Sequence, residues 1–534
     1  MSLSPRVTRF AGAALLLSVS AALVWGRDKG RISADKLLQD VRYLASPALG
    51  GRGSGSPGLT KAAEYIAGQF SRAGLKPMGA NGGYFQSFPI ATEARVSGPN
   101  TLTWTVSGGG GGEPHAVAEG DLEPAAFSAS GTVRGRVVFA GYGATACEYG
   151  YDDYAGVDVR GKIVVILRHE PQEYENSRAF EGRIYSEHSQ IFRKLLTAKQ
   201  RGAAAVLLVN DTVNHSGPDV PEKLTSLPSP GGAGIPFAGL RASVLEQWFR
   251  EAGKDFAATQ ARIDKTLEPQ SFEFSADIQL ELQISVQAET RMISNVVGYL
   301  PGETDEYLII GAHYDHLGTG QQYSLASNQT GTVHPGADDN ASGSAAVLAL
   351  ARHFSSLPKM RRGILFVTFA GEEIGLLGST WITQHPVMPI RNATAMINMD
   401  MIGRMRDHSL IVGGVTSGEG MRARVEAVAK HFPFELQMGG QAVYGSSDHT
   451  AFTSHQIPVL FFFTGLHADY HRPSDTPDKI DSRNTALIAD LVAGVATSLA
   501  TTPDRPAFHI PEGMKRCGEQ KFSLARPQRA DKVW

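Results

Sequence analysis

The chain has 534 residues, more than one typical domain, so we expect two or more hydrophobic cores. Hydrophobic residues make up 42% of the sequence and charged residues 19%, as in an ordinary globular protein. The formal net charge of -3 gives no basic field, so we expect no nucleic acid partner.

The N-terminus has the layout of a secretory signal peptide, which we predict for residues 1–26. Arg6 and Arg9 precede an apolar run from Phe10 to Trp25, and small residues near its end offer cleavage sites. The run is shorter than the ~20 apolar residues of a spanning helix, although an uncleaved N-terminal anchor is the alternative. We therefore expect an exported protein, periplasmic or extracellular, with no stable membrane partner unless the signal stays attached. Its oligomeric state is open.

Residues 30–90 open with two predicted helices. Ser33 is a suitable N-cap, and apolar residues follow it at helical spacing. A loop rich in Gly, Ser and Pro, from Gly50 to Gly58, precedes a second amphipathic stretch from Thr60 to Ala73. This pattern predicts a compact helical opening.

Residues 91–287 consist of short β-like runs between glycines. Predicted strands run from Val137 to Ala140, from Lys162 to Leu167 and from Ala203 to Val209, with a helix from Phe192 to Gln200. A β-rich segment with one crossover helix is typical of a separate domain.

After Ser294 the pattern alternates between strands and helices. The predicted strands are Tyr307 to Ala312, Arg362 to Ala370, Ala395 to Met399 and Pro458 to Phe463, with a helix from Ala341 to Ser355. Continuous apolar strands alternating with helices indicate an α/β fold, with a central sheet covered by helices on both faces. We expect residues 30–90 and 288–502 to form one domain that carries 91–287 as an insertion, followed by a tail at 503–534.

Side chains that can bind metals follow these strands. They are His313 with Asp315, Asp338 with Asp339, Glu372 with Glu373, Asp400, and His471 in a later loop. In open α/β sheets the ligand crevice forms at the carboxyl ends of the strands. Acidic and imidazole groups that converge there would repel one another unless cations bind between them.

The kinds of donor indicate the metal. With only two cysteines, Cys147 and Cys517, the chain must hold any metal through His and carboxylates, which suits Zn²⁺, or Mn²⁺ or Co²⁺ in its place. One tetrahedral zinc with an open position needs fewer carboxylates than these, whereas two ions ~3.5–4 Å apart with a bridging carboxylate use them all. Such a pair activates water, so hydrolysis is the expected chemistry.

Five motifs in this order resemble the co-catalytic di-zinc aminopeptidase family, over roughly residues 30–90 and 285–500. The motifs are His313-Tyr-Asp315, Gly336-Ala-Asp-Asp-Asn-Ala-Ser-Gly343, Gly371-Glu-Glu373, Asn398-Met-Asp400 and Tyr470-His-Arg-Pro-Ser-Asp-Thr476. The resemblance implies two Zn²⁺ per chain and a zinc-exopeptidase-like mixed central sheet.

The same resemblance assigns roles to individual residues. It implies Asp338 as the bridging carboxylate, His313 and Asp400 as ligands of one zinc, and Glu373 and His471 as ligands of the other. It further implies Glu372 as the general base, Asp315 as the carboxylate that orients His313, and a cis peptide between Asp338 and Asp339. Tyr444, three residues before Ser447-Asp-His449, matches a Tyr that points at the developing oxyanion.

The middle segment resembles the protease-associated domain inserted in many of these enzymes. The similarity rests on Ala140-Gly-Tyr-Gly143 and on the run from Tyr151 to Ile166. The resemblance implies that this domain limits or shapes access of substrates.

The sequence therefore predicts a metal-dependent exopeptidase that removes N-terminal residues from peptide substrates. A carboxypeptidase or dipeptidase of the same family is the first alternative, although the motifs carry no compact Arg cluster for a substrate carboxylate. A non-catalytic relative of the transferrin-receptor type is the second, although none of the five expected ligands is missing.

Overall fold

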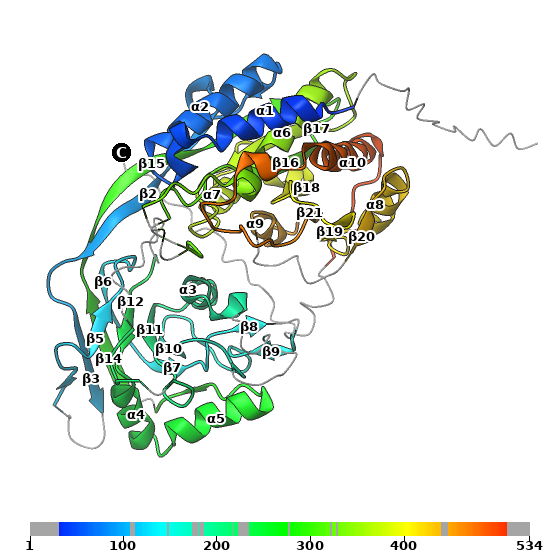
Figure 1. The fold of residues 1–534 in the computed structure, drawn as a ribbon. Coiled ribbons are helices and arrows are strands. Elements are labelled where there is room, and N and C mark those ends of the chain that lie inside the picture. The colour runs from blue at the N-terminus through cyan, green and yellow to red at the C-terminus, as the bar shows by residue number, and fades with distance from the viewer. Residues whose placement is uncertain are drawn as a thin grey trace, which may run out of the picture. The chain divides into compact units, whose positions relative to one another are not determined.

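The computed structural model describes residues 31–106, 113–146, 149–173, 180, 186–215, 217–222, 234–275, 278–320, 323–326, 329, 331–438 and 447–509 (Figure 1). The predicted signal segment, both cysteines, Tyr444 and residues 510–534 of the predicted tail lie outside these ranges.

The largest sheet of the described chain is mixed and has nine strands in the order β1-β15-β17-β16-β18-β21-β19-β20, with β2 paired to β15. The strands are β1 (Lys76–Pro77), β2 (Phe85–Val96), β15 (Val286–Leu300), β16 (Tyr307–His313), β17 (Gly363–Phe369), β18 (Ala393–Met399), β19 (Ser409–Gly413), β20 (Glu435–Gln437) and β21 (Val459–Phe463). Strands β17, β16, β18 and β21 run parallel in its centre, whereas β15 and β19 pair antiparallel with them.

Helices lie on both faces of this sheet, as the sequence predicts (Figure 1). They are α1 (Ala34–Leu44), α2 (Pro57–Arg72), α6 (Gly343–Ser355), α7 (Leu377–Gln384), α8 (Met421–Ala429), α9 (His449–Thr453) and α10 (Ser482–Thr501). The predicted cap of α1 is confirmed, because the side chain of Ser33 accepts a hydrogen bond from the amide of Lys36.

The central strands β16, β17 and β18 are mostly apolar and buried along their whole length, because both of their faces are covered. On β16, Leu308 and Ile310 pack into the core that contains α1, α2, α6 and α10. Tyr307 and Ile309 point the other way and pack with Ile382 of α7. The predicted α/β fold class is therefore confirmed.

Helix α10 is long and apolar enough to cross a membrane by length and composition alone. Most of its apolar window, 67%, is buried inside the fold, where it contacts α1, α6 and α8. This is the pattern of a core helix.

The middle of the chain forms further sheets. A six-stranded sheet has the order β13-β7-β10-β11-β12-β5, and a four-stranded sheet the order β4-β3-β14-β6. The elements of this region are β3 (Thr101–Val106), β4 (His115–Ala116), β5 (Leu122–Pro124), β6 (Gly131–Gly135), β7 (Val137–Phe139), β8 (Thr145–Ala146), β9 (Tyr151–Asp152), β10 (Ile163–Leu167), α3 (Ile191–Gln200), β11 (Ala205–Val209), β12 (Phe237–Leu240), α4 (Ala242–Glu251), α5 (Phe256–Thr266), β13 (Phe272–Glu273) and β14 (Ile278–Ile284). The expectation of one helix here is wrong, since α4 and α5 accompany α3 and pack on the apolar core of this region.

The two long strands β2 and β15 pair antiparallel from Phe85 with Val296 to Val96 with Val286. Both predicted boundaries of the insertion, 90/91 and 287/288, fall inside this ribbon. The chain therefore enters and leaves the middle region along two strands hydrogen-bonded to each other.

Candidate metal centre

The expected donor residues lie where parallel strands of the nine-stranded sheet end. His313 is the last residue of β16, Glu372 and Glu373 follow β17, and Asp400 directly follows β18. Because neighbouring parallel strands end at the same edge of a sheet, their following side chains meet there. His471 joins them from the loop after β21.

His313 is at the centre of the first group of donors. Its Nε2 lies 3.3 Å from Oδ1 of Asp400 and 3.9 Å from Oε2 of Glu372. The three ligand atoms all lie within 4.8 Å of one another, a spacing at which they could share one metal ion.

Asp339 connects this group to a second one. Its Oδ1 lies 3.4 Å from Nε2 of His313, and its Oδ2 lies 3.3 Å from Nε2 of His471. Nε2 of His471 also lies 3.1 Å from Oε2 of Glu373. One carboxylate thus presents an oxygen to each of two imidazoles, which is the arrangement of a bridging ligand.

Asp338, the expected bridging carboxylate, does not lie between the two imidazoles, whereas the next residue does. Oδ1 of Asp338 accepts a hydrogen bond from the amide of Gly403, and its Oδ2 lies 3.1 Å from Nε2 of His467. This carboxylate is buried and fully engaged away from His313 and His471. The cis peptide is likewise one position later than expected, between Asp339 and Asn340.

The donor atoms of the cluster fit a metal ion. Nε2 of His471 and Oδ2 of Asp339 are buried and have no hydrogen-bond partner within the described part of the chain. A buried polar atom without a partner costs free energy, so such atoms are expected where a ligand completes the site. Both atoms lie in a set of imidazoles and carboxylates without thiolate, which suits zinc.

Taken together, burial and the neighbouring charges raise the pKa values of both Glu372 and His313. Burial raises the pKa of Glu372 well above its ordinary value, and Asp400 and Glu373 add to that rise against the opposing effect of His313. Burial alone would lower the pKa of His313, but Asp400 and Glu372 outweigh it and raise that pKa well above its ordinary value. The carboxylates therefore produce a strongly negative potential, which favours cations.

Asp315 lies beside His313, as expected, and also supports the loop that carries Glu372. Its Oδ1 lies 3.7 Å from Nδ1 of His313 and accepts a hydrogen bond of 3.1 Å from the amide of Glu372. Its Oδ2 accepts a hydrogen bond from Ser54. Asp315 therefore links a donor imidazole to the adjacent acidic pair.

Other residues of the motifs contact the donor residues and fix their positions. Ser447 donates a hydrogen bond of 2.7 Å to Oδ2 of Asp400, and Nδ1 of His316 lies 2.6 Å from Oε1 of Glu373. Asp475 accepts hydrogen bonds from the amides of Asp338 and Asp339. The motif containing Asp475 was visible in the sequence, but its contact with a segment 136 positions away was not.

Arg52 is a supporting residue without a sequence signal of its own. It is fully buried, and its guanidinium donates to the carbonyl oxygens of Leu44, Tyr314, Pro335 and Gly336. Tyr314 follows His313 directly, and Gly336 precedes the turn of Asp339. One side chain therefore fixes both segments. Tyr444, the expected oxyanion donor, lies outside the described residues.

Comparison with known families agrees with the motifs. Residues 295–496 match the model of peptidase family M28, and residues 133–248 match the model of the PA domain. The resemblance expected from the five motifs and from the middle segment is thereby confirmed.

Curated relatives match over part of their length. A probable leucine aminopeptidase of Arthroderma otae is 30% identical over 210 residues, which are 38% of this chain and 56% of that protein. Leucine aminopeptidase 2 of Trichophyton rubrum is 26% identical over 265 residues, which are 43% of this chain and 50% of that protein. The chain thus spans little more than half the length of these relatives.

Among solved structures, the aminopeptidase of Aneurinibacillus sp. strain AM-1 is similar with a TM-score of 0.49 and 24% identity, over 90% of this chain and 97% of that one. A zinc aminopeptidase of Bacillus subtilis is similar with a TM-score of 0.47 and 21% identity, over 89% of this chain and 96% of that one.

Proposed function

Since residues 295–496 carry a peptidase family M28 domain and residues 133–248 a PA domain, we propose that the chain is a zinc-dependent aminopeptidase. The observation that carries the proposal is Asp339, whose two carboxylate oxygens face His313 and His471 at distances of 3.4 and 3.3 Å. A carboxylate between two imidazoles, each with a further carboxylate partner, suits two adjacent metal ions.

Five side chains would hold the pair of ions. His313 and Asp400 would bind one, His471 and Glu373 would bind the other, and Asp339 would bind both. Bound zinc would supply activation of the attacking water and polarisation of the scissile carbonyl group.

Glu372 is placed to act as the general base. Its amide is fixed by Asp315, its Oε2 lies 3.9 Å from Nε2 of His313, and its side chain is 12% exposed, so a substrate can reach it. Oε2 of Glu372 takes a proton from the attacking water and later delivers it to the nitrogen of the leaving amine. The same carboxyl group thus acts as the base in the first step and as the acid in the second.

The relatives named above favour cleavage at the amino end, because both are called leucine aminopeptidases. We therefore take leucyl peptides as the first substrates to test. Arg404, one of the arginines near the motifs, already forms ion pairs with Asp469 through both of its terminal nitrogens. Its engagement agrees with an enzyme that does not bind the substrate carboxylate through this residue.

The proposal is tested with a panel of aminoacyl-p-nitroanilides that includes leucyl-p-nitroanilide. Hydrolysis should stop when a strong chelator removes the metal and return when zinc is added. Full activity in protein shown by elemental analysis to be free of metal would refute a metal-dependent mechanism.

The number of ions is tested by replacing both histidines of the centre, as His313→Ala/His471→Ala. The variant should contain about two fewer zinc ions per chain than the parent protein, because each ion would keep only Asp339 and one further carboxylate, fewer ligands than a zinc site needs. A loss of only one ion would indicate that the centre of the parent protein is mononuclear.

A further inference from the structure

The middle region contains a second convergence of metal-capable side chains, on its six-stranded sheet. Strands β10 and β11 are parallel neighbours, and their last residues, Leu167 and Val209, pair in register. His169 lies two residues past the end of β10, and Asp211 two residues past the end of β11. The two loops therefore start side by side at the carboxyl edge of the sheet.

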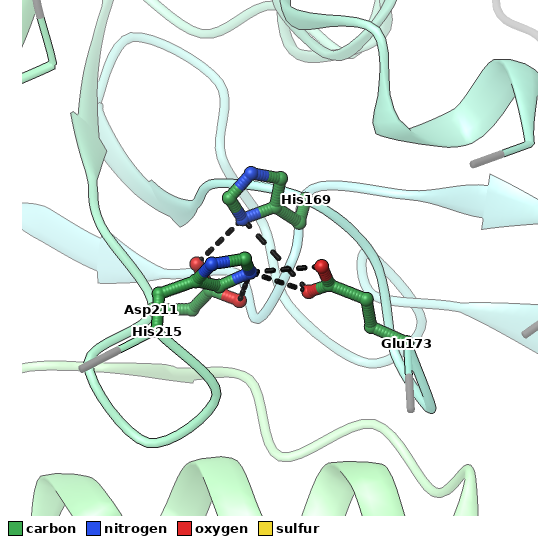
Figure 2. A group of neighbouring side chains, drawn as sticks. All are labelled: His169, Glu173, Asp211 and His215. Carbon is green, nitrogen blue, oxygen red and sulfur yellow. Dashed lines mark hydrogen bonds and ion pairs between the residues drawn. The ribbon is translucent and has the colours of Figure 1, made fainter. Parts of the chain in front are cut away.

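Each loop supplies a second donor four residues further on, namely Glu173 and His215. Figure 2 shows the four side chains pointing toward one another. Nδ1 of His169 lies 2.8 Å from Oδ1 of Asp211, and Nε2 of His215 lies 2.7 Å from Oε2 of Glu173. The two imidazole rings stack with their centres 4.0 Å apart.

All four donors are close enough to share one ion. The longer separations, Nδ1 of His169 to Oε2 of Glu173 and Nε2 of His215 to Oδ2 of Asp211, are 3.9 and 3.8 Å. One ligand atom from each residue lies within 4.8 Å of the others. Ligands ~2.0–2.2 Å from a tetrahedral zinc are separated by little more than 3 Å, so the two short pairs would move slightly apart and the two long pairs slightly together around an ion.

The burial of the two carboxylates is the second observation. Asp211 is completely buried, and its Oδ2 has no hydrogen-bond partner in the described chain. Glu173 is only 4% exposed. Two buried carboxylates in one place are costly unless cations pair with them. The imidazoles of His169 and His215 are 17% and 32% exposed, which leaves a route for an ion from solvent.

Neighbouring groups hold both loops without using the donor atoms. Asp264 of α5 accepts hydrogen bonds from the amide of Gln172 in one loop and from the side chain of Asn214 in the other. The buried amine of Lys194 donates to the carbonyl oxygens of Leu167 and His169. Such outer contacts are typical of metal sites, because they fix the direction of each ligand.

We propose that His169, Glu173, Asp211 and His215 form a zinc site that links the loops after β10 and β11, separate from the centre at His313. Two imidazole nitrogens and two carboxylate oxygens without thiolate suit a tetrahedral zinc ion. The site consists of protein ligands on all four sides, so its role is to stabilise the middle region and not to perform chemistry.

The test is the zinc content of the full-length protein, stripped with chelator, reconstituted with zinc chloride and separated from free metal. Four chains are compared: the parent, His169→Ala/His215→Ala, His313→Ala/His471→Ala, and the chain with all four replacements. Replacing His169 and His215 should remove about one zinc ion per chain in both backgrounds. The variant His115→Ala, an exposed histidine of the same region, should lose none.

The four-chain design separates this site from the proposed catalytic centre. If the zinc content falls only with the His313 and His471 replacements, the second site is refuted while the proposed function stands. If the zinc content falls only with the His169 and His215 replacements, the second site stands and the proposed metal centre at His313 is refuted.

Asp211→Asn is a milder variant, which tests the site even if the double histidine variant does not fold. Asparagine keeps the size of the side chain and an acceptor for His169 but removes the charge, so zinc affinity should fall at least ~10-fold. In the His313→Ala/His471→Ala background, chelator should lower the melting temperature, and Asp211→Asn should abolish that shift. Unchanged zinc affinity in Asp211→Asn would show that the four residues form hydrogen-bonded ion pairs only.

Discussion

Asp338 and Asp339 are chemically identical neighbours with different surroundings. Asp338 is held by the amide of Gly403 and by His467, whereas Asp339 faces His313 and His471. Both oxygens of the first carboxylate have contacts within hydrogen-bond distance, whereas the second has a buried oxygen without a hydrogen-bond partner in the described chain, so the second is the better candidate ligand.

Asparagine replacements distinguish the two. Asp339→Asn should lower zinc affinity at least ~10-fold, because it removes the charge shared by both ions. Asp338→Asn should keep its zinc but unfold more easily, by about 2 kcal/mol, because charge-assisted hydrogen bonds are lost. Zinc titration and chemical denaturation of both variants check this. Zinc loss confined to Asp338→Asn would restore the assignment expected from the sequence.

Glu372 and Glu373 form a second adjacent pair, for which we propose different roles. Glu373 pairs with His471 and His316, which overcome burial and the neighbouring Asp339 and lower its pKa to about 2. The pKa of Glu372 moves in the opposite direction because burial and Asp400 dominate over His313. A permanently charged carboxylate suits a ligand, and one that can carry a proton suits a base.

Glutamine replacements test this division. Glu372→Gln should lower kcat at least ~10²-fold while zinc content stays near that of the parent. Glu373→Gln should weaken one metal site, and added zinc should restore part of its activity. Measuring kcat and bound zinc in both variants decides the matter, since metal loss in Glu372→Gln alone would reverse the two roles.

At the scale of the element, the strand-end loops depend on buried side chains that cross between them. Arg52, from the turn after α1, is hydrogen-bonded to four carbonyl oxygens in three different segments. Burial lowers its pKa to about 10, against the nearby Asp315 and Asp339, so it remains charged at neutral pH. This positive charge also offsets part of the negative charge of the metal centre.

Arg52→Leu should therefore destabilise the fold by about 3 kcal/mol, because it leaves buried carbonyl groups without donors. Arg52→Lys should recover part of this loss, since an amine reaches fewer acceptors than a guanidinium does. Chemical denaturation of both variants gives the values, with the exposed Arg72→Leu as a control that should change stability by less than about 0.5 kcal/mol. Equal stability of Arg52→Leu and this control would show that the Arg52 contacts are dispensable.

Elements with a strong local pattern were predictable. The strands β10, β11, β16 and β17 stand out as apolar runs because both faces are buried. The ribbon of β2 and β15 was not predicted, because its strands carry many polar residues and pair across long separations. Ser87 and Ser294, for example, lie 207 positions apart yet share a hydrogen bond.

The motifs of the candidate site were predictable from the sequence, but the choice of ligand between adjacent residues was not. The order of the motifs located His313, Glu373, Asp400 and His471, whereas the choice between Asp338 and Asp339 depends on backbone directions that the sequence does not encode locally. The second cluster had a usable signal, since His169 and Asp211 each follow a predicted strand by two residues. Its pairing still required the parallel register of β10 and β11.

Within the described ranges, metal-capable residues gather at two places on different sheets, one around His313 and one around His169. The group at His313 has an excess of carboxylates, of which Glu372 is partly exposed, and this suits the proposed catalysis. The group at His169 has two histidines and two carboxylates and no additional base, which suits a stabilising ion. Export of the protein stays a prediction from residues 1–26.

The polarity of peptide cleavage distinguishes an aminopeptidase from a carboxypeptidase. A leucyl peptide is offered in three forms: free at both ends, acetylated at the amino end, and amidated at the carboxyl end. We expect release of leucine from the free and the amidated peptides, none from the acetylated one, and none from any form after chelation. Cleavage of the acetylated peptide together with failure on the amidated one would contradict this expectation and indicate a carboxypeptidase.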